Sequence, residues 1–149
     1  MKIKKFILAS DHAGFYLKES IKKFLLKKRK KVLDLGVNNS KTVDYPDYAH
    51  LLSKKMMKNK NAFGVLVCGS GTGMSITANR HKNIRAALCY DLKSTKLSRQ
   101  HNNANVMAIG ARLTKRNVAL KCVSLFMKTN FEGGRHIRRV NKIWFYDKT

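Results

Sequence analysis

One stretch near the middle of the chain constrains the fold more than any other. Residues 63–67 form an apolar run that leads to Cys68, and glycines follow at the alternate positions 69, 71 and 73. We interpret the run as a buried strand that enters a glycine-rich turn, with a short helix beginning at about Met74. Glycines adopt positive φ and carry no side chain, so the N–H groups of such a turn can surround one anion. The stretch predicts an anion site beside a cysteine.

The glycine turn fits none of three familiar phosphate motifs. A P-loop has lysine after its last glycine, and a cysteine phosphatase loop has arginine six residues after the cysteine, but Met74 occupies both positions. A dinucleotide fingerprint requires G-x-G-x-x-G on the first strand, whereas this turn reads G-x-G-x-G after a later one. Two interpretations remain open. Cys68 abstracts a proton beside a loop that stabilises an enolate, or it is a core residue before a tight turn.

The composition predicts a single domain over residues 1–149, long enough for one substantial core. No stretch approaches the roughly 18–20 apolar residues that a membrane span needs. The apolar run before Ser10 is too short for a signal peptide, so we expect a cytoplasmic protein without membrane association. Cys68, Cys89 and Cys122 are widely spaced and form no C-x-x-C, which favours reduced thiols over disulfides or a zinc site.

The net charge of +24 raises the question of nucleic-acid binding. Much of this charge lies in residues 27–31 and on the polar sides of the predicted helices. The chain has neither zinc-finger spacing nor an aromatic-rich RNA-binding signature. We therefore interpret the charge as a compositional bias at solvated positions and keep nucleic-acid binding as a minority hypothesis. The charge should still attract anionic substrates.

Apolar strand patterns and helical patterns alternate along the whole chain. The predicted strands are residues 4–10, 31–35, 63–67, 85–89 and 106–110. Helices are predicted after Asp11, over 46–58, from 74, over 94–101, after a Thr114 cap, and from about 135 with Ile137, Val140 and Trp144 facing the core. This alternation predicts a doubly wound, Rossmann-like α/β/α sandwich with a five-stranded parallel sheet and a C-terminal helix.

Chemically active residues follow several of these strands. The carboxyl ends of parallel strands meet at one edge, so Asp11, His12, Cys68 and Arg112 are predicted to converge on one crevice. Asp11 could instead only cap the helix that follows it. A second set lies later in the chain.

This second set contains one histidine and two arginines. His101 ends the fourth predicted helix, a position where a histidine is more often a surface or capping residue. Arg135 and Arg139 are one helical turn apart, which suits a clamp on one phosphate, although a solvated basic turn is the alternative.

Taken in order, these motifs resemble the type B ribose-5-phosphate isomerases, in the sugar-phosphate isomerase family that includes the galactose-6-phosphate isomerases. The matching segments are residues 10–14, 44–46, 67–76, 84–86, 97–102, 105–106, 110–112 and 130–136, and they span nearly the whole chain. The resemblance implies a cofactor-free aldose–ketose isomerase of the non-oxidative pentose phosphate pathway. It would interconvert ribose 5-phosphate and ribulose 5-phosphate through a cis-enediolate, as a homodimer or tetramer with sites at the subunit interface.

The resemblance also implies roles for individual residues. Cys68 matches the base that moves a proton between C2 and C1, His101 matches a residue that helps to open the furanose ring, and Ser70 joins them in the catalytic set. The implied substrate contacts are Asp11, His12, Tyr45, Gly69, Ser70, Gly71, Thr72, Gly73, Asn102, Arg112, Arg135 and Arg139, with no metal. Ser70 stands where the family more often has threonine, and Thr72 where it often has an apolar residue. The alternatives are an isomerase of allose or galactose 6-phosphate, and a basic nucleic-acid-binding protein on this fold.

Overall fold

The computed structural model describes residues 5–145. Its five strands form one parallel sheet in the order β2-β1-β3-β5-β4. The strands are β1 (Lys5–Ser10), β2 (Lys31–Asp34), β3 (Ala62–Cys68), β4 (Ala86–Leu88) and β5 (Val106–Gly110). The strand β3 is central, and its Val65 pairs with Leu8 of β1 and Met107 of β5. The predicted doubly wound α/β fold is confirmed, while Lys4 of the predicted first strand lies outside the described residues.

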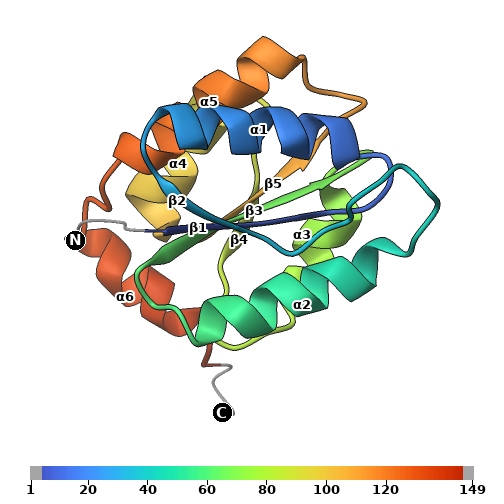
Figure 1. Ribbon diagram of the computed structural model, residues 1–149. Coiled ribbons are helices and arrows are strands. Elements are labelled where there is room, and N and C mark those ends of the chain that lie inside the picture. Colours follow the sequence, from blue (N-terminus) through green and yellow to red (C-terminus); the bar gives the residue numbers. More distant parts are fainter. Residues whose placement is uncertain (1–4, 146–149) are drawn as a thin grey trace.

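Helices cover both faces of the sheet (Figure 1). The helices α1 (Phe15–Lys27) and α5 (Arg116–Lys128) pack on one face, and α2 (Tyr45–Met57) and α3 (Thr72–Ala78) pack on the other. Side chains alternate along β1 as a strand requires, since Phe6 and Leu8 face the first pair and Ile7 and Ala9 the second. Within residues 5–145, no helix is long and apolar enough to cross a membrane.

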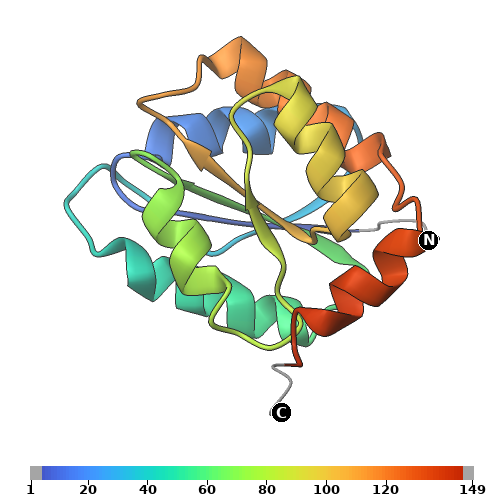
Figure 2. The ribbon, with the colours of Figure 1, turned by 180° about the vertical axis from the view of Figure 1, so that it is seen from behind.

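One further helix lies beside the edge strand β4, and another packs next to that helix (Figure 2). The helix α4 (Leu92–Asn102) contacts both α5 and the last helix, α6 (Arg135–Lys142). A buried arginine anchors the end of α4. Arg99 stacks on Phe63 and Phe126, with 4.7 and 5.5 Å from its guanidinium carbon to the ring centres, and donates a hydrogen bond to the carbonyl of Thr129 at 3.1 Å. Arg99 therefore fixes α4 against the core.

Some local predictions are wrong. Lys115, not Thr114, is the N-cap residue of α5, and the hydroxyl of Thr114 is buried without a partner. In α6 the buried residues are His136 and Val140, whereas Ile137 is 50% exposed. A helix of eight residues buries only a narrow stripe, and the stripe here runs through positions i and i+4. The spacing of residues along the sequence was compatible with either His136 or Ile137 on the buried side of the helix.

Candidate active site

A cleft of about 320 Å³ opens where β1, β3 and β5 end. Asp11 follows β1, Cys68 ends β3, and Arg112 lies two residues beyond β5. Because β3 lies between β1 and β5, these residues reach the same edge side by side. Their predicted convergence is confirmed. The full lining is Asp11, Tyr45, Cys68, Gly69, Ser70, Gly73, Arg112 and Leu113. Leu113 is an addition that no sequence pattern indicated.

Cys68 is held against the turn that follows it. The backbone N–H of Gly71 donates a hydrogen bond to its Sγ at 3.1 Å. Gly71 is the N-cap residue of α3 and has a φ of 78°, in the left-handed region. A Cβ at this position would lie 2.7 Å from Leu88 Cδ1 and 2.9 Å from the carbonyl carbon of Ile109. Only glycine fits here, and its N–H gives the sulfur of Cys68 a hydrogen-bond donor.

Two other glycines of the turn let side chains approach the loop closely. A Cβ on Gly73 would lie 2.6 Å from the ring of Tyr45, and one on Gly69 would lie 3.1 Å from Arg112 Nη1. The backbone N–H of Arg112 also donates to the carbonyl of Gly69 at 3.0 Å. A phenol and a guanidinium therefore lie against the same backbone that contacts Cys68. The cleft combines a thiol with hydrogen-bond donors suited to sugar oxygens or to an anion.

Asp11 has a structural role as well as a place in the cleft. Its Oδ1 accepts a hydrogen bond from the backbone N–H of Gly14 at 3.0 Å, which stabilises the turn before α1. Gly14 is the N-cap residue of α1, and no side chain caps that helix. Asp11 is therefore not the N-cap residue of α1, and its carboxylate keeps capacity for further hydrogen bonds to a ligand in the cleft.

His12 is not among the residues that line this cleft, although the sequence predicts that it shares the crevice. Its Nδ1 lies 3.2 Å from the backbone nitrogen of Val43, which can donate to it. This contact with the segment before α2 holds His12 away from the space that Asp11 lines. Among residues 5–145, no histidine lines the cleft.

The remaining predicted residues form a separate group. His101 and Asn102 end α4, while Arg135 and Arg139 lie on α6, and none of the four lines the cleft around Cys68. A helix that follows a parallel strand runs back across the sheet, so its last turn lies at the amino edge. The cleft lies at the carboxyl edge, where β1, β3 and β5 end. Within one chain, the topology keeps His101 away from Cys68.

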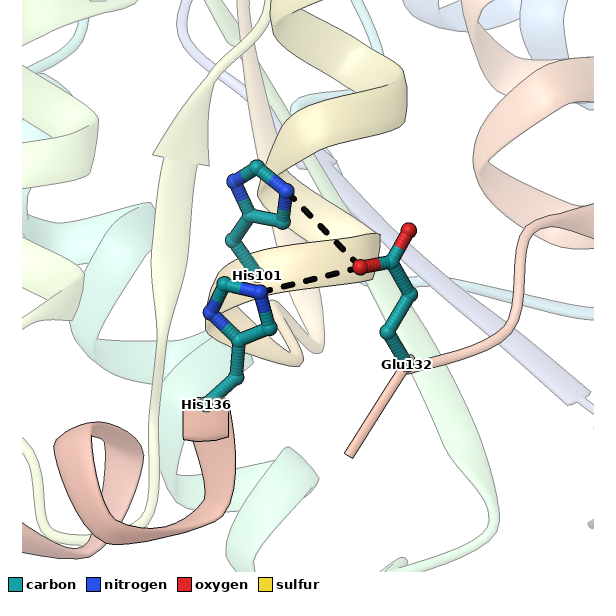
Figure 3. A group of neighbouring side chains, drawn as sticks. All are labelled: His101, Glu132 and His136. Atoms are coloured by element: carbon teal, nitrogen blue, oxygen red, sulfur yellow. Dashed lines mark ion pairs between the residues drawn. The ribbon is translucent and has the colours of Figure 1, made fainter. Parts of the chain in front are cut away.

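Residues that no prediction singled out complete this second group. The imidazole of His136 stacks on that of His101, with ring centres 4.3 Å apart and planes 12° apart. Glu132 Oε2 lies 3.6 Å from Nε2 of His136 and 3.9 Å from Nε2 of His101 (Figure 3). Glu132 and His136 belong to the segment 130–136 that supports the family resemblance, and their four-residue spacing was the available signal.

A doubly wound sheet with a cysteine and a glycine turn at its carboxyl edge defines a Rossmann-like protein with a small-molecule cleft. The family model described as Ribose/Galactose Isomerase matches residues 6–143, and the chain belongs to this family. The crystal structure of a ribose 5-phosphate isomerase from Thermotoga maritima is 47% identical, with a TM-score of 0.91 over 93% of this chain and 96% of that one.

Two other relatives agree with this family. The structure of ribose-5-phosphate isomerase B from Mycoplasma genitalium with bound ribulose-5-phosphate is 43% identical, with a TM-score of 0.90 over 93% of each chain. Ribose-5-phosphate isomerase B of Escherichia coli K12 is 39% identical over 141 residues, which are 95% of each chain. The similarity extends through both groups of residues described above.

Proposed function

We propose that this protein interconverts D-ribose 5-phosphate and D-ribulose 5-phosphate. The observation that supports this most is a free cysteine at the cleft, with the N–H of Gly71 directed at its sulfur at 3.1 Å. Aldose–ketose isomerisation needs a base at C2 and hydrogen-bond donors at the oxygens of the intermediate. The named relatives are ribose-5-phosphate isomerases at 39–47% identity.

In the proposed reaction, the Cys68 thiolate removes the proton from C2 of the open-chain aldose. The electron pair of that C–H bond forms the carbon–carbon double bond of a cis-enediolate. A proton also moves from O2 to O1, and the same thiol then returns the first proton to C1, so that C2 becomes the ketone carbon and C1 carries the hydroxyl, with no net gain or loss of electrons. The N–H groups of the turn, residues 69–73, and the Ser70 hydroxyl would stabilise the enediolate oxygens. Asp11, Tyr45 and Arg112 would bind sugar hydroxyls at the cleft wall.

We further propose that a second copy of the chain completes each site. His101, Asn102, Arg135 and Arg139 are chemically suited to ring opening and phosphate binding, yet the topology keeps them at the opposite edge from Cys68. Apolar side chains are exposed beside both groups, Leu113 at 74% and Ile137 at 50%. A twofold contact would bury both and bring the two groups together, which supports a homodimer or a tetramer built from dimers. His12 would then bind phosphate from the neighbouring loop.

The remaining features fit a cytoplasmic enzyme whose partner is a small anion. Cys68, Cys89 and Cys122 are all free, which supports a reducing compartment. We propose that residues 1–149 act as one isomerase domain and that the high positive charge attracts sugar phosphates rather than serving nucleic-acid recognition.

The deciding test is conversion of ribose 5-phosphate to ribulose 5-phosphate by purified wild type and Cys68→Ala, without added metal. Activity in the wild type and its loss in a folded Cys68→Ala variant would support both the reaction and its base. A folded but inactive wild type would contradict the proposal, and the six-carbon phosphates would then be tested as substrates.

A further inference from the structure

Three metal-ligating side chains converge where α4 meets α6. One ligand atom from each of His101, Glu132 and His136 lies within 4.8 Å of the other two. Figure 3 shows the carboxylate of Glu132 reaching toward both imidazoles from one side. The exposure is graded, because the side chain of His136 is 7% exposed, that of His101 37% and that of Glu132 48%. The cluster therefore has a fixed inner ligand and an open outer side.

The backbone holds these three side chains together. The N–H of Glu132 donates to the carbonyl of Gln100 at 3.1 Å, which ties the segment before α6 to the last turn of α4. The N–H of His136 donates to the carbonyl of Gly133 at 3.0 Å, which forms the turn at the start of α6. The stacked rings limit each other's rotation. The ligand set is thus positioned by contacts that do not depend on an ion.

The separations are longer than hydrogen bonds and close to those across a coordinated ion. Glu132 Oε2 is 3.6 and 3.9 Å from the two Nε2 atoms, whereas an N–H···O bond ends at about 3.2 Å. A tetrahedral zinc ion with bonds of about 2.0–2.1 Å places neighbouring ligand atoms about 3.3–3.4 Å apart. A small rotation of Glu132, the most exposed of the three side chains, would shorten both separations toward that value.

We propose that His101, Glu132 and His136 form a binding site for a divalent transition-metal ion of the Zn²⁺ class, and that the bound ion inhibits the enzyme by occupying His101. Two imidazoles and one carboxylate are a ligand set that Zn²⁺ uses, with a fourth position left for water. The inhibition rests on the proposed function, in which His101 acts on the substrate. The binding of the metal ion does not depend on that function.

The local charges set the strength of this site. Glu132 supplies one negative charge, while Arg135 and Arg139 lie near His136 and oppose a cation. We therefore expect reversible binding, weaker than that of a structural zinc site.

A second histidine pair provides a matched control. Nδ1 of His50 lies 2.7 Å from Nε2 of His81, with the rings edge to face. In the described part of the chain, the only group of three candidate ligands is the one at α4 and α6, so this pair lacks a third. The variants His50→Gln and His136→Gln each remove one imidazole from a pair. Only His136→Gln removes a ligand from a set of three.

Metal binding is tested first, by calorimetric titration of Zn²⁺ into the full chain. The background is Cys68→Ala, because a cleft thiol also binds zinc. We expect one Zn²⁺ per chain, binding weakened at least about tenfold by Glu132→Gln or His136→Gln, and no comparable change with His50→Gln; loss of an outer-shell partner alone costs about 10–100-fold. Glu132 is half exposed, so its variant should fold even if His136→Gln does not. Unchanged affinity in folded Glu132→Gln would overturn the site.

Inhibition is tested second, with Cys68 intact. Zn²⁺ should inhibit the wild type, and Glu132→Gln, with its activity expressed relative to its own metal-free rate, should need at least about tenfold more Zn²⁺ for half inhibition. Equal inhibition of both proteins would assign the effect to Cys68 and overturn the regulatory part. A wild type inactive without metal would refute the proposed function, while the calorimetric result would still decide the site.

Discussion

The backbone N–H of Gly71 lies 3.1 Å from Sγ of Cys68 and donates a hydrogen bond to it. This contact exists because Gly71 has a φ of 78° at the start of α3, with Leu88 and Ile109 close behind it. The geometry of the proposed base thus depends on a residue without a side chain. Five predictions follow from this contact and from others in the molecule.

Gly71→Ala should destabilise the protein and disrupt the loop. The left-handed backbone costs about 1–2 kcal/mol for alanine, and overpacking against Leu88 costs about 1–3 more, so we expect a loss of about 2–5 kcal/mol. The measurement is the free energy of unfolding in urea. Gly133→Ala is the control, since its φ is 68° and an added Cβ would meet only Ile137, at 3.6 Å. Equal losses in the two variants would show that the crowding at Gly71 is unimportant.

Alkylation should discriminate among the three cysteines. Burial raises the pKa of the Cys89 thiol to about 11, and burial also raises the pKa of Cys122, so both should remain unreactive thiols at neutral pH. Cys68 lines the cleft and should react with iodoacetamide first. Peptide mass spectrometry over time identifies the site. Ribose 5-phosphate should slow the reaction, whereas free ribose at the same concentration should not. Preferential labelling of Cys89 would contradict this view of the cleft.

Asp34→Asn should destabilise the fold because the buried Lys18 loses its partner carboxylate. The Nζ of Lys18, a side chain only 1% exposed, lies 2.7 Å from Asp34 Oδ2. Removing the carboxylate leaves a buried ammonium with only Glu19 nearby, and we expect a loss of about 3 kcal/mol. Lys22→Gln is the control, because Lys22 contacts the same carboxylate from an exposed position and should cost no more than about 1 kcal/mol. Similar losses in both would contradict the importance of burial.

The same carboxylate predicts an acid dependence. Burial alone would raise the pKa of Asp34, but hydrogen bonds from Lys18, Gly36 and Lys22 outweigh it and lower the pKa below 3.8. The unfolded chain then binds the proton more readily, so this stabilisation is present above about pH 3.8 and is lost as the pH falls through the folded value. Unfolding free energies measured from pH 6 to pH 3 should fall less steeply for Asp34→Asn than for the wild type.

Mixing two inactive variants should restore activity. If Cys68 and His101 meet only across a subunit interface, a mixed dimer of Cys68→Ala and His101→Ala has one intact site. Random exchange makes about half of the dimers mixed, so about a quarter of the wild-type activity should return. The assay is isomerisation after the two proteins are unfolded and refolded together.

The control for this experiment uses two residues of the same cleft. Cys68 and Arg112 line it within one chain, so Cys68→Ala mixed with Arg112→Ala places a defect in every site. That mixture should stay inactive. Rescue in the control, or failure in the Cys68 and His101 mixture, would contradict the shared site.

The sequence by itself was sufficient to predict the sheet and the part of the candidate site that lies around Cys68. Strand and helix patterns are local, and the rule that parallel strands end at one edge places Asp11, Cys68 and Arg112 together without any side-chain detail. The glycines at alternate positions indicated a tight turn for the same reason, because backbone conformation is a property of a few adjacent residues.

Only the tertiary structure decided the features that depend on contacts between distant segments. The direction of His12 depends on Val43, the burial of Arg99 depends on Phe63 and Phe126, and the cluster of Glu132 with two histidines depends on how α6 meets α4. The packing of distant segments also decided that Thr114 does not cap α5 and that Ile137 is exposed. Helical spacing defines a face of a helix, but the packing of neighbouring elements determines which side chains on that face are buried.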